Sequence, residues 1–191
     1  MMPAPKRQLT ILTDLDDVLW DLLGVWINEL NLRNGTRVMP RDVTDWEIAK
    51  FFPGITPEKL FEPLHDERIW NRILPIRGAV TYVNQLMLDG HKLRVVTATH
   101  PATATPKIKR FLELFPMFKW EDIVIASDKS LIHGDVMIDD GTHNLADVKG
   151  GVEYLFLFDR PHNHDYDAMA NGMNRVNSWE EIYNKIRDIA G

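Results

Sequence analysis

Short apolar runs alternate with segments of helical periodicity along most of this chain. The runs at 9–13, 93–98, 123–126, 136–138 and 154–158 have the length and composition of strands that are buried on both faces. In the segments between them, apolar residues recur every three to four positions, which is the spacing of an amphipathic helix. Strands that alternate with helices form a mostly parallel sheet that helices cover on both sides. The alternation therefore predicts an α/β fold.

Two helix starts can be read directly from the sequence. Thr105 is expected to be the N-cap of a helix whose first residue is Pro106, because proline fits the first helical turn. Ser178 and Glu181 fit the capping box, in which two side chains satisfy free backbone N–H groups. Helices are expected over 18–34, 79–89, 105–115 and from 179 onward, whereas 159–177 is expected to be a loop.

Residues 36–75 differ in amino-acid composition from the rest of the chain. Prolines are frequent there, and tryptophan and phenylalanine side chains stand between them. Because proline interrupts helices and strands, this stretch is expected to form the short helices and turns of a small accessory unit. We expect a core of residues 1–19 and 75–191, with an inserted unit of residues 20–74.

Acidic side chains follow two of the expected strands at the point where each strand ends. Asp14, Asp16 and Asp17 come after the first run, and Asp139-Asp140 follow a later one. Ligands of parallel sheets bind beyond these carboxyl ends. Carboxylates gathered there would repel one another and raise their pKa values unless a cation lay among them. Mg²⁺, which prefers oxygen ligands and also binds phosphate, suits such a site.

Thr97 and Lys129 supply the other groups that a phosphate ester needs. The hydroxyl of Thr97 comes at the end of the second run, and the ammonium of Lys129 precedes the last acids. Each group also has an ordinary explanation. The acids can cap a helix or form a turn, Thr97 can be a plain strand residue, and Lys129 can be solvated. We favour the combined interpretation, in which a metal, an ammonium and a hydroxyl converge on one anion.

The charge and composition exclude several classes of partner. A formal net charge of −6 with scattered basic residues argues against a nucleic-acid polymer. Lys107, Lys109 and Arg110 form the nearest approach to a basic cluster, which we interpret as the solvated face of one helix. No stretch approaches the ~20 apolar residues that span a bilayer, and Met1–Arg7 lacks a signal-peptide core. A cytoplasmic location is therefore expected. The absence of cysteine excludes disulfides and thiol nucleophiles.

The motifs, taken in order, resemble those of a known superfamily. Thr13–Val18, Val95–Thr97, Lys129 and Met137–Asp140 are similar to the four motifs of the haloacid dehalogenase superfamily. Within it, the chain resembles the 5′(3′)-deoxyribonucleotidase family at Asp14–Leu19, Pro75–Val80, Ser127–Ser130 and Arg175–Ile182. The resemblance implies a Rossmann-like core with a small helical cap inserted after the first strand. It also implies a magnesium-dependent phosphatase that acts on deoxyribonucleoside monophosphates.

The resemblance assigns a role to each motif residue. Asp14 would be the nucleophile that forms an aspartyl-phosphate, and Asp16 the general acid and then the general base. Mg²⁺ would be held by Asp14, the backbone carbonyl of Asp16 and Asp140, whose spacing from Lys129 matches the family, with Asp139 acting through water. The phosphoryl oxygens would be bound by Thr97, Lys129, Ala98 and Thr99.

Substrate recognition is expected to come from the cap. The candidates are Leu22, Trp46, Phe51 and Phe52, since stacking on a base contributes about 1–3 kcal/mol whatever the base. The alternative is that the three aromatic residues form the core of the cap itself. Asp17 stands where the superfamily often has glycine, and it is expected to point away from the site.

Several alternatives stay open. His100 either touches the phosphate or sugar or is a plain loop residue. His162, His164 and Asp165 could be drawn as a second metal site, but we favour a solvated polar loop. The substrate could be another small ester, such as a sugar phosphate or a phospho-amino acid. A receiver-type signalling module is disfavoured, because its acidic pair precedes its phospho-acceptor. A homodimer also stays open.

Overall fold

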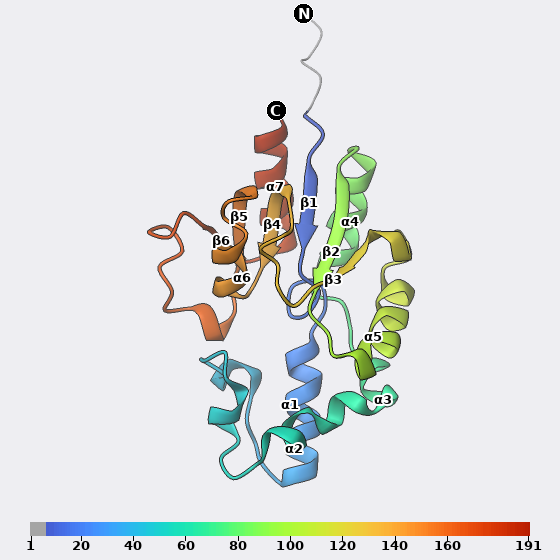
Figure 1. Ribbon diagram of the computed structural model, residues 1–191, viewed down its shortest axis with the longest axis vertical. Coiled ribbons are helices and arrows are strands. Elements are labelled where there is room, and N and C mark those ends of the chain that lie inside the picture. The colour runs from blue at the N-terminus through green and yellow to red at the C-terminus, as the bar shows by residue number, and fades with distance from the viewer. Residues whose placement is uncertain (1–6) are drawn as a thin grey trace, which may run out of the picture.

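The computed structural model describes residues 7–191. Residues 1–6, which belong to the predicted core and to the segment inspected for a signal peptide, lie outside the described residues. A six-stranded sheet forms the centre of the molecule, in the order β3-β2-β1-β4-β5-β6, and every pairing is parallel (Figure 1). The predicted α/β fold is confirmed. The strands are β1 (Thr10–Thr13), β2 (Lys92–Thr97), β3 (Ile123–Ile125), β4 (Gly134–Asp139), β5 (Val152–Phe158) and β6 (Asn174–Val176).

Helices cover both faces of the sheet because neighbouring strand residues point to opposite sides. Ile11 and Val95 belong to one buried cluster, together with residues of α4, α5 and α7. Leu12 and Val96 belong to a second cluster, together with Leu145 of α6. The bounds of these helices are Ala79–Leu88 for α4, Pro101–Leu114 for α5, Thr142–Asp147 for α6 and Trp179–Ala190 for α7.

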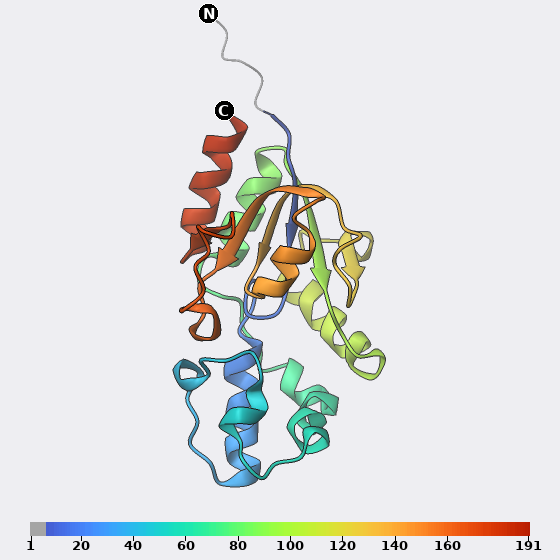
Figure 2. The ribbon, with the colours of Figure 1, turned by 60° about the vertical axis from the view of Figure 1, so that its left-hand side comes forward.

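A helical unit lies beyond the carboxyl ends of the strands, at the lower end of the molecule in Figures 1 and 2. We use this name for residues 22–70. As expected from the prolines, its elements are short apart from α1: α1 (Leu22–Asn34), η1 (Pro40–Asp42), η2 (Ile48–Phe51), α2 (Pro57–Phe61), η3 (Glu62–His65) and α3 (Glu67–Trp70). It has a small core of its own, made of Ile27, Leu30, Val43, Ile48, Phe52 and Leu60.

Three predicted boundaries were wrong. Helix α1 begins at Leu22 and not at Val18, because Asp21 caps it by accepting a hydrogen bond from the Gly24 N–H. The segment expected as a loop contains β6 and a 3-10 turn, η5 (Pro161–Asn163). In the part of the chain that the structure describes, no helix has the length and apolar character of a membrane span.

The third boundary concerns α5, which begins at Pro101 and not at Thr105. The His100 side chain caps this helix by accepting a hydrogen bond from the Ala102 N–H, so Pro106 lies inside the helix. At the last helix, by contrast, Ser178 is the N-cap as predicted, and its Oγ accepts from the Glu181 N–H at 3.2 Å. The Glu181 carboxylate bonds to the Asn177 N–H, one residue earlier than a capping box requires.

Candidate active site

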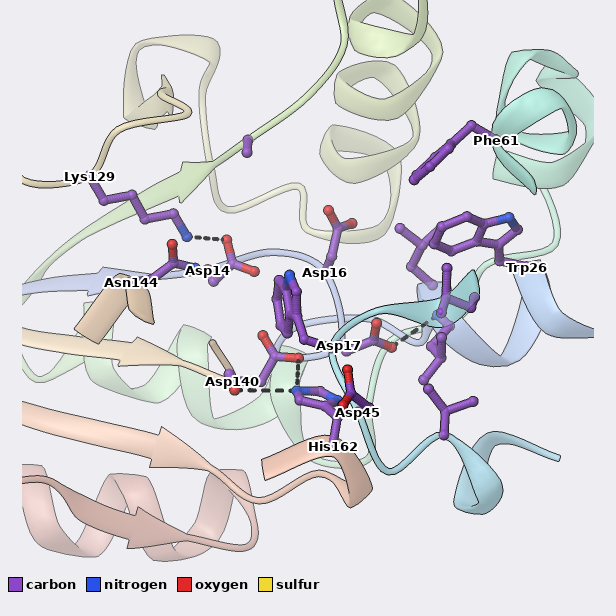
Figure 3. A pocket seen from close by; sticks show the side chains of 16 residues that line it. Asp14, Asp16, Asp17, Trp26, Asp45, Phe61, Lys129, Asp140, Asn144 and His162 are labelled. Carbon is purple, nitrogen blue, oxygen red and sulfur yellow. Dashed lines mark hydrogen bonds and ion pairs between the residues drawn. The ribbon is translucent and has the colours of Figure 1, made fainter. Parts of the chain in front are cut away.

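Three buried carboxylates meet where β1 and β4 end. Since these two strands are neighbours, Asp14 after β1 lies beside Asp139 and Asp140 at the end of β4. Carboxylate oxygens from all three lie within 4.8 Å of one another. Figure 3 shows Asp14 and Asp140 facing the same cavity. The two acidic motifs, separated by more than a hundred positions in the sequence, therefore form one cluster.

The ammonium of Lys129 lies between two of these carboxylates. Its Nζ donates to Asp14 Oδ1 and to Asp139 Oδ2, each at 2.7 Å, and the lysine is only 2% exposed. Asp139 Oδ1 accepts from the Gly141 N–H and from the Asn144 amide. Both oxygens of Asp139 are thus engaged by the protein, and Oδ2 is the one that accepts from the Lys129 ammonium.

The electrostatics of the cluster favour a cation. The pKa of Asp14 is raised to about 8, chiefly by burial and also by the neighbouring carboxylates of Asp139, Asp16 and Asp140, while Lys129 acts to lower it. Burial also raises the pKa of Asp140. The ammonium of Lys129 alone does not compensate the three carboxylates of Asp14, Asp139 and Asp140. The donor set consists of oxygen atoms, which a hard divalent ion such as Mg²⁺ prefers. The residues present fit that ion.

Asp140 is held by a histidine from beyond β5. His162 Nε2 lies 3.3 Å from Asp140 Oδ2, and the histidine side chain is 8% exposed. The backbone carbonyl of Asp140 also accepts a hydrogen bond from the Asn163 amide. The interpretation of His162 as part of a solvated loop was wrong. His164, whose side chain is 63% exposed, contacts Asp159 instead.

A buried lysine that the sequence interpretation missed engages the second aspartate. Lys107, 2% exposed, extends from α5 to contact Asp16 Oδ2, Thr97 Oγ1 and the Ala98 carbonyl. Asp16 Oδ1 accepts from the indole of Trp20. A signal was available, because Lys107 stands four residues from both Thr103 and Phe111, the other buried positions of α5. Its interpretation as part of a solvated face was wrong.

Asp17 also turns toward the site, contrary to the expectation that it would point away. It adopts the left-handed conformation, with φ of 56°, which explains why glycine suits this position. Its Oδ1 accepts from the Leu23 N–H at 3.0 Å, at the start of α1 (Figure 3). Burial raises the pKa of this carboxyl well above its usual range.

Two cavities open on either side of Asp16, between the core and the helical unit. The first, of about 280 Å³, is lined by Asp14, Asp140 and Lys129. The second, of about 690 Å³, lies on the Lys107 side. Leu22, Trp26, Phe61 and Ala98 line both. Trp26 and Phe61 were missed as lining residues, and Figure 3 shows both rings at the end of the first cavity away from Lys129.

The other residues predicted to bind phosphate or substrate differ in whether they line a cavity. Trp46 lines the first cavity, with its ring edge-on to His143 and His162 at 4.7 and 5.2 Å between centroids. Phe51 and Phe52 line neither cavity; Phe52 is 1% exposed, inside the core of the helical unit. Thr99 lines the second cavity, and its hydroxyl pairs with that of Thr103. Thr97 is fully buried, and its hydroxyl accepts from Lys107.

Comparisons with known proteins agree with this geometry. Residues 7–190 match the family described as 5′ nucleotidase, deoxy (pyrimidine), cytosolic type C protein. The chain is 33% identical to the 5′(3′)-deoxyribonucleotidase of Bacillus subtilis (strain 168) over 177 residues, which cover 92% of this chain and 97% of that protein. It is 27% identical to the 5′(3′)-deoxyribonucleotidase of Clostridium acetobutylicum, over 90% of this chain and 91% of the relative.

A solved structure shares the fold. The haloacid dehalogenase family hydrolase from Deinococcus radiodurans R1, solved with bound phosphate and sodium, superposes with a TM-score of 0.66 at 15% identity and covers 97% of this chain and 96% of its own. The motif resemblance, the family match and the parallel sheet agree with one another. The chain therefore belongs to the 5′ nucleotidase, deoxy (pyrimidine), cytosolic type C family, and it is a phosphoric monoester hydrolase.

Proposed function

We propose that this protein is a magnesium-dependent phosphatase that hydrolyses deoxyribonucleoside monophosphates to a nucleoside and phosphate, with residues 20–74 as a cap over the site. The observation that carries the proposal is the convergence of Asp14, Asp140 and Lys129 in one buried cavity, with Asp16 at its edge. Relatives of nearly equal length are named 5′(3′)-deoxyribonucleotidases, which supports this substrate class.

The proposed metal ligands are Asp14, the backbone carbonyl of Asp16 and Asp140. Asp140 is preferred to Asp139 because both oxygens of Asp139 already accept hydrogen bonds from the protein. A bound Mg²⁺ would supply positive charge that offsets the negative charge of the phosphoryl oxygens. Asp139 would then act on the site through Lys129, whose ammonium it holds.

Asp14 is the proposed nucleophile. Its Oδ1 accepts from Lys129, while its Oδ2 accepts no hydrogen bond from the described residues. That oxygen would attack phosphorus to form an aspartyl-phosphate as the ester P–O bond breaks. Asp16 would donate its proton to the leaving oxygen, and would then take a proton from the water that hydrolyses the aspartyl-phosphate. Lys129 would bind a phosphoryl oxygen and stabilise its charge in the transition state.

Thr97 is proposed to act at the phosphate end together with the backbone of Ala98 and Thr99. Its hydroxyl is oriented by Lys107, which also holds Asp16. The phosphate-binding segment and the acid–base residue would thus be fixed relative to each other by one ammonium.

The test is a substrate panel. Phosphate release with Mg²⁺ is measured from deoxyribonucleoside and ribonucleoside 5′- and 3′-monophosphates, beside sugar phosphates and phosphoserine. The proposal expects the deoxyribonucleotides to have the highest kcat/KM. An equal or higher kcat/KM for the other esters would reject the substrate class while leaving the phosphatase chemistry intact.

A further inference from the structure

The second cavity adjoins the acid–base residue on the side away from the acidic cluster. Asp16 and Lys107 line it, whereas Asp14, Asp140 and Lys129 line only the first cavity. A general acid must stand at the bond between phosphorus and the leaving oxygen. With the phosphoryl group in the first cavity, the leaving group therefore extends past Asp16 into the second. Its volume of about 690 Å³ is within the range of small-ligand pockets.

The cavity wall contributed by the helical unit is aromatic and fixed. The rings of Trp26 and Phe61 lie 5.1 Å apart and are inclined at 42°. The indole N–H of Trp26 donates to the Leu60 carbonyl at 2.7 Å, which holds the ring in position. A flat heterocycle gains stacking energy against such a wall without regard to its identity. This wall accounts for affinity, and selectivity requires polar groups elsewhere in the cavity.

Two imidazoles supply those polar groups, one from each side of the cavity. His65 ends η3 in the helical unit, His100 precedes α5 in the core, and their ring centroids are 5.9 Å apart with planes at 77°. His100 Nδ1 accepts a hydrogen bond from the Ala102 N–H, so the ring proton belongs on Nε2. His100 therefore presents its Nε2–H group as a hydrogen-bond donor.

We infer that His65 and His100 are specificity-determining residues, which hydrogen-bond the polar edge of a nucleobase that stacks in the second cavity. The inference rests on the proposed function and adds the position of the leaving group to it. Trp46 is not needed as a stacking platform, because its ring packs on His143 and His162. Since one histidine belongs to the helical unit and the other to the core, a base would bridge the two.

Three variants test the inference. His100→Asn removes the imidazole but keeps a side chain that is favoured at an N-cap, so α5 is preserved. His65→Ala removes the partner ring. His164→Ala is the matched control, since His164 is exposed and lines neither cavity. Steady-state kcat and KM are measured with Mg²⁺ for thymidine 5′-monophosphate and for 2-deoxyribose 5-phosphate, which has the same phosphate and sugar but no base.

The inference expects His100→Asn and His65→Ala each to raise KM for the nucleotide about 10-fold, the loss of one hydrogen bond of ~1.4 kcal/mol, with kcat changed little. The KM for 2-deoxyribose 5-phosphate should stay within about 2-fold, and His164→Ala should change neither. An unchanged nucleotide KM, or equal changes for both substrates, would overturn the inference. A failure of the proposed function would look different, because the unsubstituted protein would then not prefer the nucleotide to the sugar phosphate.

Discussion

Lys107 connects Asp16 to Thr97 through a single buried ammonium. The Nζ atom contacts the carboxylate of one residue and the hydroxyl of the other, and the lysine side chain is only 3% exposed. The other oxygen of Asp16 accepts from Trp20 Nε1 at 2.8 Å. The proposed acid–base residue is therefore held from two sides, by a helix that follows β2 and by the turn that follows β1.

Lys107→Met should reduce kcat strongly. The substitution keeps most of the volume but leaves Asp16 and Thr97 without their shared donor, so the carboxylate loses its orientation. We expect kcat to fall about 10- to 100-fold, which is at or below the lower end of the roughly 10²- to 10⁴-fold that general acid–base catalysis contributes, because Asp16 itself is still present. Lys109→Met is the control, since Lys109 is exposed on the same helix. Equal kcat values for the two variants would remove Lys107 from the site.

Asp140→Asn and Asp139→Asn should both lose activity, but with a different dependence on the Mg²⁺ concentration. Loss of a metal ligand at Asp140 should raise the Mg²⁺ concentration for half-maximal activity about 10-fold or more, and excess Mg²⁺ should restore much of the rate. Asp139→Asn removes a charged partner of Lys129, so excess Mg²⁺ should not restore its rate. Titration of activity with Mg²⁺ distinguishes them, and the reverse pattern would make Asp139 the ligand.

The stabilisation by Mg²⁺ should increase with pH. The pKa of Asp14 is raised from 3.8 to about 8 in the folded protein, so its stabilising contribution is complete below about pH 4 and is lost as pH rises through 8. A bound cation requires the carboxylate form, and its affinity therefore rises over the same range. Each tenfold gain in affinity adds ~1.4 kcal/mol at saturating Mg²⁺.

The measurement is the change in Tm on adding Mg²⁺ at pH 6 and at pH 8. We expect the larger increase at pH 8, and Asp14→Asn should remove most of the difference between the two pH values. An increase that is the same at both pH values would contradict the raised pKa of Asp14.

Phe52→Ala should destabilise the protein far more than Phe51→Ala. Phe52 is 1% exposed in the core of the helical unit, whereas Phe51 is only partly buried against it. Truncation of a fully buried phenylalanine costs about 3–5 kcal/mol. Urea unfolding of the two variants provides the comparison. Equal free energies of unfolding would show that Phe52 does not support this core.

The sheet and the acidic cluster could be predicted because they depend on patterns that are short and local. A buried parallel strand is an apolar run, and its carboxyl end is where the run stops, so Asp14 and Asp140 could be assigned to one edge before any coordinates. The start of α5 could not be read in this way. Pro101 and Pro106 both fit a first helical turn, and threonine is a more common N-cap than histidine. Only the hydrogen bond from the Ala102 N–H to His100 decides between the two starts.

Two site residues were not predicted from the sequence, and the physical reason is the same for both. Lys107 and His162 are polar side chains whose usual location is the protein surface, and only the packing of α5 and of the chain after β5 brings them to Asp16 and Asp140. The positions of the aromatic residues in the helical unit could not be predicted either. Phe52 and Trp26 have similar hydrophobicity, and the sequence does not show which ring fills the core and which faces the cavity.

The most direct test of the account is Mg²⁺-dependent phosphate release from thymidine 5′-monophosphate by the Asp14→Asn variant. The substitution is nearly isosteric, so the variant should fold, and a cooperative thermal unfolding transition verifies this before activity is measured. We predict that a folded Asp14→Asn protein loses essentially all turnover, because the amide that replaces the carboxylate is too weak a nucleophile to attack phosphorus. Turnover near that of the unsubstituted protein would contradict the assignment of Asp14 as the nucleophile.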